Sequence, residues 1–172
     1  MNVKHILILT LTCTVYHCSS AMNPADITPS RATLSAMLDK ARSIEAASKI
    51  PSGLTLEQDT AKCNALANNA LSVNLQDANV NFKALEKTSE EALIALGKRT
   101  HNPARPSNES NDPRVLRCTV RHAYAMYMQA PEAQAKLQGE GAQAFRQAAI
   151  QKMITTPEAT AGAAFFAALK NQ

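Results

Sequence analysis

The chain has no tryptophan, only five glycines, and an aromatic content of 4% across 172 residues. β-Sandwiches and barrels need aromatic and β-branched residues at a period of two, which this composition does not favour. Alanine, a strong helix former, is abundant instead. We therefore expect an all-α fold, an irregular bundle of five to seven helices, in a single domain of ordinary size.

The sequence also lacks the common motifs of catalysis and cofactor binding. It contains no G-x-S-x-G nucleophile elbow, no glycine-rich phosphate loop and no C-x-x-C-H haem attachment sequence. After the first 21 residues the histidines are His101 and His122, and neither is followed by a histidine, cysteine or carboxylate at i+3 or i+4. Cys118 precedes His122 by one turn and Met126 follows it by one turn, which leaves a soft-metal or haem site as an alternative. We expect no catalytic, metal-binding or cofactor-binding residues.

The first 21 residues have the pattern of a secretory signal peptide. Lys4 precedes a short apolar run, and small residues at 19–21 provide a cleavage site near Ala21. The run is too short to span a bilayer. The pattern predicts a secreted or periplasmic protein with a formal net charge of +3, since cleavage removes Lys4 and no acid from a chain of charge +4. A lipoprotein anchor on Cys13 or Cys18 is less favoured, because the residues before them do not fit a lipid-attachment motif.

Cleavage leaves two cysteines, Cys63 and Cys118. An even number of cysteines in an oxidising compartment predicts a disulfide. Cys63 lies within an apolar stripe and Cys118 on the far side of the expected central helix, so the bond would staple two helices together. Closing a loop of about 55 residues would stabilise the fold by about 4 kcal/mol. Two free buried thiols are the alternative.

Capping residues mark two helix starts in the first half of the chain. After a mobile leader at residues 22–29, Thr28 or Ser30 can start a helix whose apolar stripe ends near Lys49. Residues 55–58 then have the sequence of a capping box, in which a threonine and a glutamine cap each other's backbone amides. A second helix is expected to begin there.

A third helix is predicted from about residue 75 through Leu96, where large apolar residues fall on one face. A second capping-box sequence at residues 88–91 would allow a kink or a restart. Residues 100–111 contain two prolines and no large apolar side chain, so we expect a polar loop. Such a loop is either a binding loop or a slack connection, and the slack connection is favoured.

The bundle is expected to be built around a helix at residues 113–129. Asp112 can cap this helix, and Pro113 suits its first position. A helical wheel gives it two opposite sides that can pack, so it would be covered from two directions. One side carries Leu116, Val120, Ala123 and Tyr127, and the other carries Cys118, His122 and Ala125.

A third strip of the same helix is the candidate partner-binding surface. Arginines repeat along it at the spacing of about one turn, and they could present a basic face to an acidic partner or a membrane surface. A solvated helix edge is the simpler alternative. The strip consists of Arg114, Arg117, Arg121, Tyr124 and Met128.

Three shorter helices are predicted after residue 130. Pro131 begins the first, which the glycines at 139–141 interrupt. A second runs to about Ile154, and a third has Phe165 and Leu169 as anchors. The apolar part of the third is too short to span a bilayer, so no transmembrane segment is expected.

One short motif resembles that of a known family. Leu54-Thr55-Leu56-Glu57-Gln58 is similar to the LTxxQ signature of the Spy-type periplasmic chaperones. The resemblance covers five residues, and the motif occurs once here, whereas those chaperones usually carry it twice. It implies a small, basic, all-helical protein that holds unfolded clients on a concave surface.

These features favour a non-catalytic secreted or periplasmic protein that acts by binding another protein, as an immunity protein, an inhibitor or an effector does. A Spy-like holdase chaperone and a carrier of a small hydrophobic ligand are the alternatives. A nucleic-acid partner is not expected for a secreted chain of modest charge.

Overall fold

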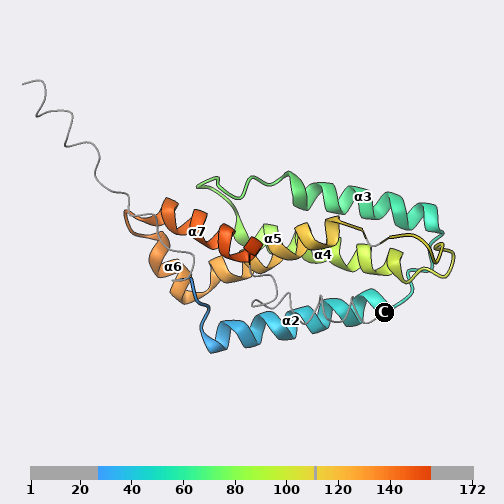
Figure 1. Ribbon diagram of the computed structural model, residues 1–172, viewed down its shortest axis with the longest axis horizontal. Helices are drawn as coiled ribbons and strands as arrows, with labels where there is room; N and C mark the ends of the chain where they lie inside the picture. Colours follow the sequence, from blue (N-terminus) through green and yellow to red (C-terminus); the bar gives the residue numbers. More distant parts are fainter. Residues whose placement is uncertain (1–26, 111, 156–172) are drawn as a thin grey trace, which may run out of the picture.

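The computed structural model describes residues 27–110 and 112–155. These residues form six helices and no strands (Figure 1), which confirms the expected all-α class. The helices are α2 (Arg31–Lys49), α3 (Leu56–Ser72), α4 (Phe82–Thr100), α5 (Arg114–Gln129), α6 (Pro131–Leu137) and α7 (Ala142–Thr155).

Helices α4 and α5 form the centre of the bundle. They pack against each other, with α2 and α3 on either side and α6 and α7 at one end (Figure 1). Nine of the 16 residues of α5 are buried, so this helix is covered from more than one direction. The central role expected for residues 113–129 is therefore shared with α4, on which both α2 and α3 pack.

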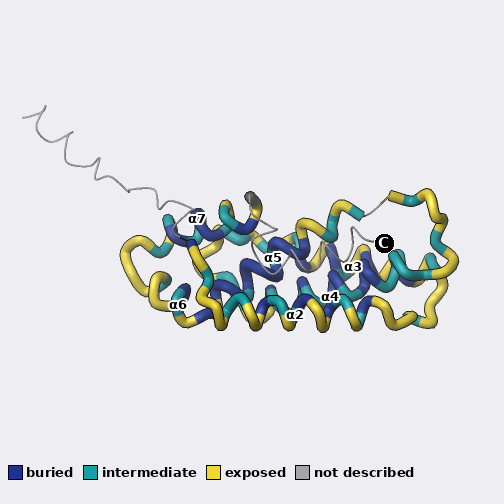
Figure 2. Tube along the Cα trace, turned by 60° about the horizontal axis from the view of Figure 1, so that its bottom comes forward, coloured by how far each residue is buried: buried dark blue, intermediate teal, exposed yellow. Residues whose placement is uncertain are grey.

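The core divides into two clusters of different residue size, both on the inner faces of the helices (Figure 2). The large-residue cluster lies where α5 meets α6 and α7, and it contains Tyr124, Tyr127 and Phe145. The small-residue cluster lies where α3, α4 and α5 meet. Of its ten buried residues, five are alanines and two are the cysteines Cys63 and Cys118.

Local sequence signals set the starts of α2 and α3. The Ser30 hydroxyl accepts the Thr33 amide at 3.2 Å and caps α2. At α3 the Gln58 amide donates to Thr55 Oγ1 at 3.2 Å, while the Thr55 amide donates to Gln58 Oε1 at 3.0 Å. The predicted cap at Ser30 and the predicted capping box at residues 55–58 are both confirmed.

Helix α4 differs from the prediction in its start and in its continuity. It begins at Phe82, not near residue 75, and the Asn81 side chain caps it by accepting the Ala84 amide at 3.0 Å. The restart considered at residues 88–91 does not occur. Thr88 lies inside an unbroken helix, where its hydroxyl donates to the Ala84 carbonyl at 3.0 Å instead of capping a new one.

Some predicted segments fall partly or wholly outside the described residues. Residue 27 belongs to the expected mobile leader at 22–29, yet the Ile27 side chain is fully buried in the large-residue cluster. The signal peptide and the last helix, with Phe165 and Leu169, lie outside the described residues. Within 27–110 and 112–155, no helix combines the length and the hydropathy needed to cross a membrane.

Side-chain hydrogen bonds hold the polar loop between α4 and α5. Arg105 donates to the backbone carbonyls of Glu109 and Ser110, each at 2.9 Å. Asn102 reaches across to α3, where it donates to Asp59 Oδ2 at 2.7 Å. These bonds tie the described part of the loop, residues 101–110, to the end of the bundle.

The disulfide predicted between Cys63 and Cys118 is wrong: both cysteines are buried, free thiols. Cys63 points at α4, where its Sγ donates to the Ala95 carbonyl at 3.0 Å. A helical wheel shows on which side of its helix a cysteine lies. It does not show which helix packs against that side, or whether the two cysteines lie at the same level along the bundle. A disulfide needs two sulfur atoms about 2.05 Å apart. Cys63 and Cys118 belong to the same core cluster, but their sulfur atoms are not at that distance.

We expect both thiols of the folded protein to resist alkylation near neutral pH. Burial raises the pKa of Cys63 and of Cys118 to about 11, so little reactive thiolate is present. Mass spectrometry after iodoacetamide treatment without reductant should show both residues unmodified in native buffer and both alkylated in urea. Alkylation in urea only after a reductant is added would contradict the free-thiol assignment.

Helices α2 and α4 approach each other closely at Gly97. A Cβ atom on this residue would overlap the Cβ of Ser48 and would lie 2.8 Å from its Oγ. The Ser48 hydroxyl is turned back onto its own helix, where it donates to the Glu45 carbonyl at 2.7 Å. The missing side chain of Gly97 therefore sets the distance between the two helices.

Candidate functional site

Two members of the predicted partner-binding strip, Tyr124 and Met128, are fully buried. The Tyr124 ring packs edge-on against Phe82, with 5.8 Å between the ring centroids. Its hydroxyl donates to the Leu75 carbonyl at 3.4 Å, and burial raises its pKa to about 12. Both residues are core residues of the described fold, so they offer no contact surface to a partner.

The three arginines of the strip lie in three different environments. Arg114 is half-buried and is bonded to Asp112 at 2.6 Å and to Asn64 of α3 at 2.7 Å. Arg121 is half-buried as well, and its Nη2 donates to the Leu71 carbonyl at 3.2 Å. Arg117 alone of the three is exposed. The five predicted residues therefore do not form one continuous surface.

Leu116 lies beside Arg117 and is 47% exposed, although it belongs to the apolar stripe of α5. The other members of the stripe, Val120, Ala123 and Tyr127, are buried. The apolar stripe therefore continues past the core onto the surface at the first turn of α5. We call the pair of Leu116 and Arg117 the α5 patch.

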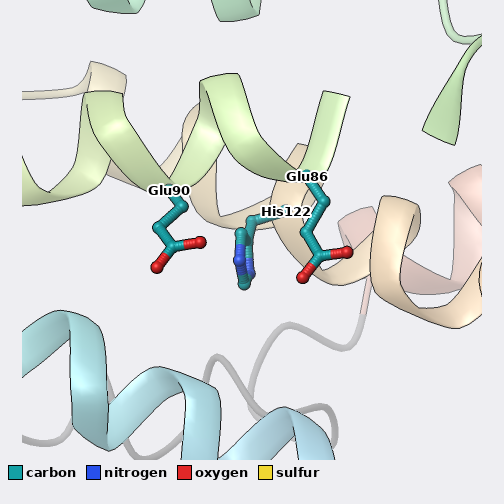
Figure 3. A group of neighbouring side chains, drawn as sticks. All are labelled: Glu86, Glu90 and His122. Atoms are coloured by element: carbon teal, nitrogen blue, oxygen red, sulfur yellow. The ribbon is translucent and has the colours of Figure 1, made fainter. Parts of the chain in front are cut away.

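A second group of side chains converges between α2, α4 and α5: Glu86, Glu90 and His122 (Figure 3). The two glutamates are four residues apart on α4, so their side chains lie on one face of that helix. His122 comes from α5, and its ring lies between the two carboxylates. One potential ligand atom from each of the three residues lies within 4.8 Å of the other two.

His122 is 6% exposed, and its Nε2 atom has no hydrogen-bond partner among residues 27–110 and 112–155. A buried polar atom without a partner typically costs about 1–3 kcal/mol. Burial is the main cause that lowers the His122 pKa to about 4, against the opposing influence of Glu86 and Glu90. The imidazole is therefore neutral near pH 7, which is the form that binds metals.

Each glutamate of the group has a neighbour of its own. Lys40 of α2 lies with its Nζ 2.8 Å from Glu90 Oε2. Gln129 of α5 donates from its Nε2 to Glu86 Oε2 at 2.6 Å. Among the described residues, two acidic side chains and one basic side chain therefore lie around His122. The group is suited to holding a cation.

A groove of about 350 Å³ adjoins this group between α2 and α5. Glu86 belongs to both, because its side chain also lines the groove. Most of the lining is apolar or small, with a few polar groups at the edge. The lining residues are Ala32, Thr33, Ala36, Met37, Glu86, Met126, Gln129, Ala130 and Pro131.

Sequence reasoning missed the group of Glu86, Glu90 and His122. It searched for ligands one turn after each histidine, whereas the partners of His122 come from another helix. Glu90 also lies mostly out of solvent, since only 24% of its side chain is exposed. The available signal was the pair of glutamates four residues apart, which sequence alone cannot orient toward a particular histidine.

Comparison with known proteins gives no relative: no family model, no curated protein and no solved structure matches this chain.

Proposed function

We propose that this protein is a non-catalytic secreted or periplasmic protein that acts by binding another protein, as an immunity protein, an inhibitor or an effector does. The signal-peptide pattern of the first 21 residues supports the compartment. The α5 patch carries the proposal for binding. Single exposed apolar residues are common, but Leu116 continues a stripe that is otherwise buried, and an arginine flanks it. Arginine is enriched at protein interfaces.

The chemistry of the buried thiols supports a role other than cysteine-based catalysis. Nucleophilic catalysis needs a thiolate beside a base. Burial raises the pKa of Cys63 and of Cys118 to about 11, which disfavours the thiolate. The LTxxQ-like segment offers little support for a holdase, since Thr55 and Gln58 cap each other's amides and so have a local role.

The test of partner binding is an affinity pull-down from the native source, read by mass spectrometry. We expect one dominant stoichiometric partner with the full chain. Its recovery should fall by at least about tenfold with the double variant Leu116→Ser, Arg117→Glu, because truncating interface anchors costs that much or more. The variant leaves the core untouched.

Ile50→Ser is the matched control, since Ile50 is 61% exposed at the end of α2 and lies outside the patch. This control should retain the partner. Equal recovery with the double variant would show that the partner binds elsewhere. If the unmodified chain captures no dominant partner, the proposal fails.

A carrier of a small hydrophobic ligand is the second candidate, and the groove between α2 and α5 is the observation in its favour. Its volume of about 350 Å³ and its apolar lining with a few polar groups resemble small-molecule sites. A co-purifying molecule, detected by native mass spectrometry of the full chain, would distinguish this function from partner binding.

A further inference from the structure

We infer that Glu86, Glu90 and His122 form a binding site for one divalent transition-metal cation of the zinc type. The three side chains converge on one point. Two helices that pack tightly against each other, α4 and α5, bring three potential ligand atoms within 4.8 Å of one another (Figure 3). Because both helices lie in the centre of the bundle, the positions of the three Cα atoms are fixed by the fold.

The buried His122 side chain indicates a ligand independently of the two glutamates. The His122 side chain is 6% exposed, its ring lies between the two carboxylates, and its Nε2 has no hydrogen-bond partner in the part of the chain that the structure describes. Buried polar atoms in native structures almost always have a partner. A cation that also binds the carboxylates would provide one for Nε2.

The charges around the two glutamates also favour a cation. Among residues 27–110 and 112–155, the only cationic side chain bonded to either glutamate is Lys40, whose Nζ lies 2.8 Å from Glu90 Oε2. Gln129, the neighbour of Glu86, carries no charge. The group therefore has an uncompensated negative charge that a dication would offset. A bound dication would also compete with Lys40 for Glu90.

The kind of ligand decides the class of metal. Mg²⁺ and Ca²⁺ prefer oxygen atoms alone, whereas an imidazole nitrogen together with carboxylates suits Zn²⁺ and its neighbours in the transition series. Three protein ligands leave a fourth zinc position open. In a tetrahedral zinc site the ligand atoms are separated by about 3.4 Å. Rotation of the two glutamate side chains can close the difference from 4.8 Å.

The experiment is a calorimetric titration of the full chain, stripped of metal with a chelator, using ZnCl₂. We expect one equivalent to bind, and Mg²⁺ at the same concentration to give no heat. Glu86→Gln and Glu90→Gln should each weaken zinc binding by at least about tenfold, since even changes behind the ligands of a metal site have effects of that size. Lys40→Gln should strengthen binding, because it removes the competing ammonium.

Glu91→Gln is the matched control. Glu91 is the next residue of α4, but it is exposed and lines a different groove, together with Lys98. This variant should bind zinc as the unmodified chain does. The two glutamate variants carry the test, because replacing the buried His122 also changes the core. Circular dichroism checks that each variant keeps its helical content.

Cobalt distinguishes this site from zinc bound by the cysteines. Co²⁺ bound by Glu86, Glu90 and His122 should give visible d–d bands without a thiolate-to-cobalt charge-transfer band. The inference is overturned if zinc does not bind stoichiometrically, if Glu86→Gln and Glu90→Gln bind as well as Glu91→Gln, or if the cobalt complex shows thiolate ligation.

Discussion

Replacing Tyr124 with alanine should lower the free energy of unfolding by about 3–5 kcal/mol, the usual loss when a buried aromatic side chain is truncated. The ring is fully buried in the large-residue cluster and packs edge-on against Phe82. Alanine would leave a cavity that the surrounding side chains can fill only in part. Urea denaturation followed by circular dichroism measures the change.

Tyr124→Phe is the matched control. It keeps the ring and removes only the hydroxyl, which donates to the Leu75 carbonyl at 3.4 Å. The loss should be about 1 kcal/mol or less. If Tyr124→Ala cost no more than Tyr124→Phe, the ring would lie on a surface, as the arginine strip of the sequence suggested.

Gly97→Ala should also destabilise the protein, by about 1–3 kcal/mol, which is the usual cost of overpacking. In an open helix the same change would stabilise by about 1 kcal/mol, because alanine is the better helix former. The sign is reversed here because the new Cβ would overlap Ser48 across the contact between α2 and α4. Urea denaturation again gives the value.

Two further variants separate crowding from other causes. Gly139→Ala should be neutral or stabilising, since a Cβ at that position would make only an ordinary contact, 3.9 Å from the Lys136 carbonyl oxygen. Adding Ser48→Gly to Gly97→Ala removes the overlapping atom, so part of the lost stability should return. Strictly additive effects of the two changes would contradict a direct clash between these residues.

Features that depend on neighbouring residues in the sequence could be predicted. The caps at Ser30 and at residues 55–58 are formed by side chains within three positions of the amides they accept. The interruption at residues 139–141, between α6 and α7, follows from two glycines. Such signals predicted the helical class and several helix ends without any knowledge of how the helices pack.

Features that depend on packing between helices could not be predicted. The apolar stripe that contains Cys63 packs against α4, because Cys63 Sγ donates to the Ala95 carbonyl. Cys63 and Cys118 both lie on inward faces of their helices, but this did not suffice to predict a disulfide. Tyr124 and Met128 fell on a strip with arginines, yet α5 is covered on that side too. The approach of Glu86 and Glu90 to His122 depends on the rotation and height of two helices, which one sequence does not fix.

The two core clusters imply that the two ends of the bundle would drift differently in sequence. Around Tyr124, Tyr127 and Phe145, a loss of volume at one position can be balanced by a gain at its neighbour, as cores that keep their total volume allow. Around the alanines and cysteines, and at Gly97, the backbones are already close. Only three of the ten buried residues of this cluster are larger than cysteine, and a methyl group added at Gly97 would overlap Ser48, so this end should retain small residues longest.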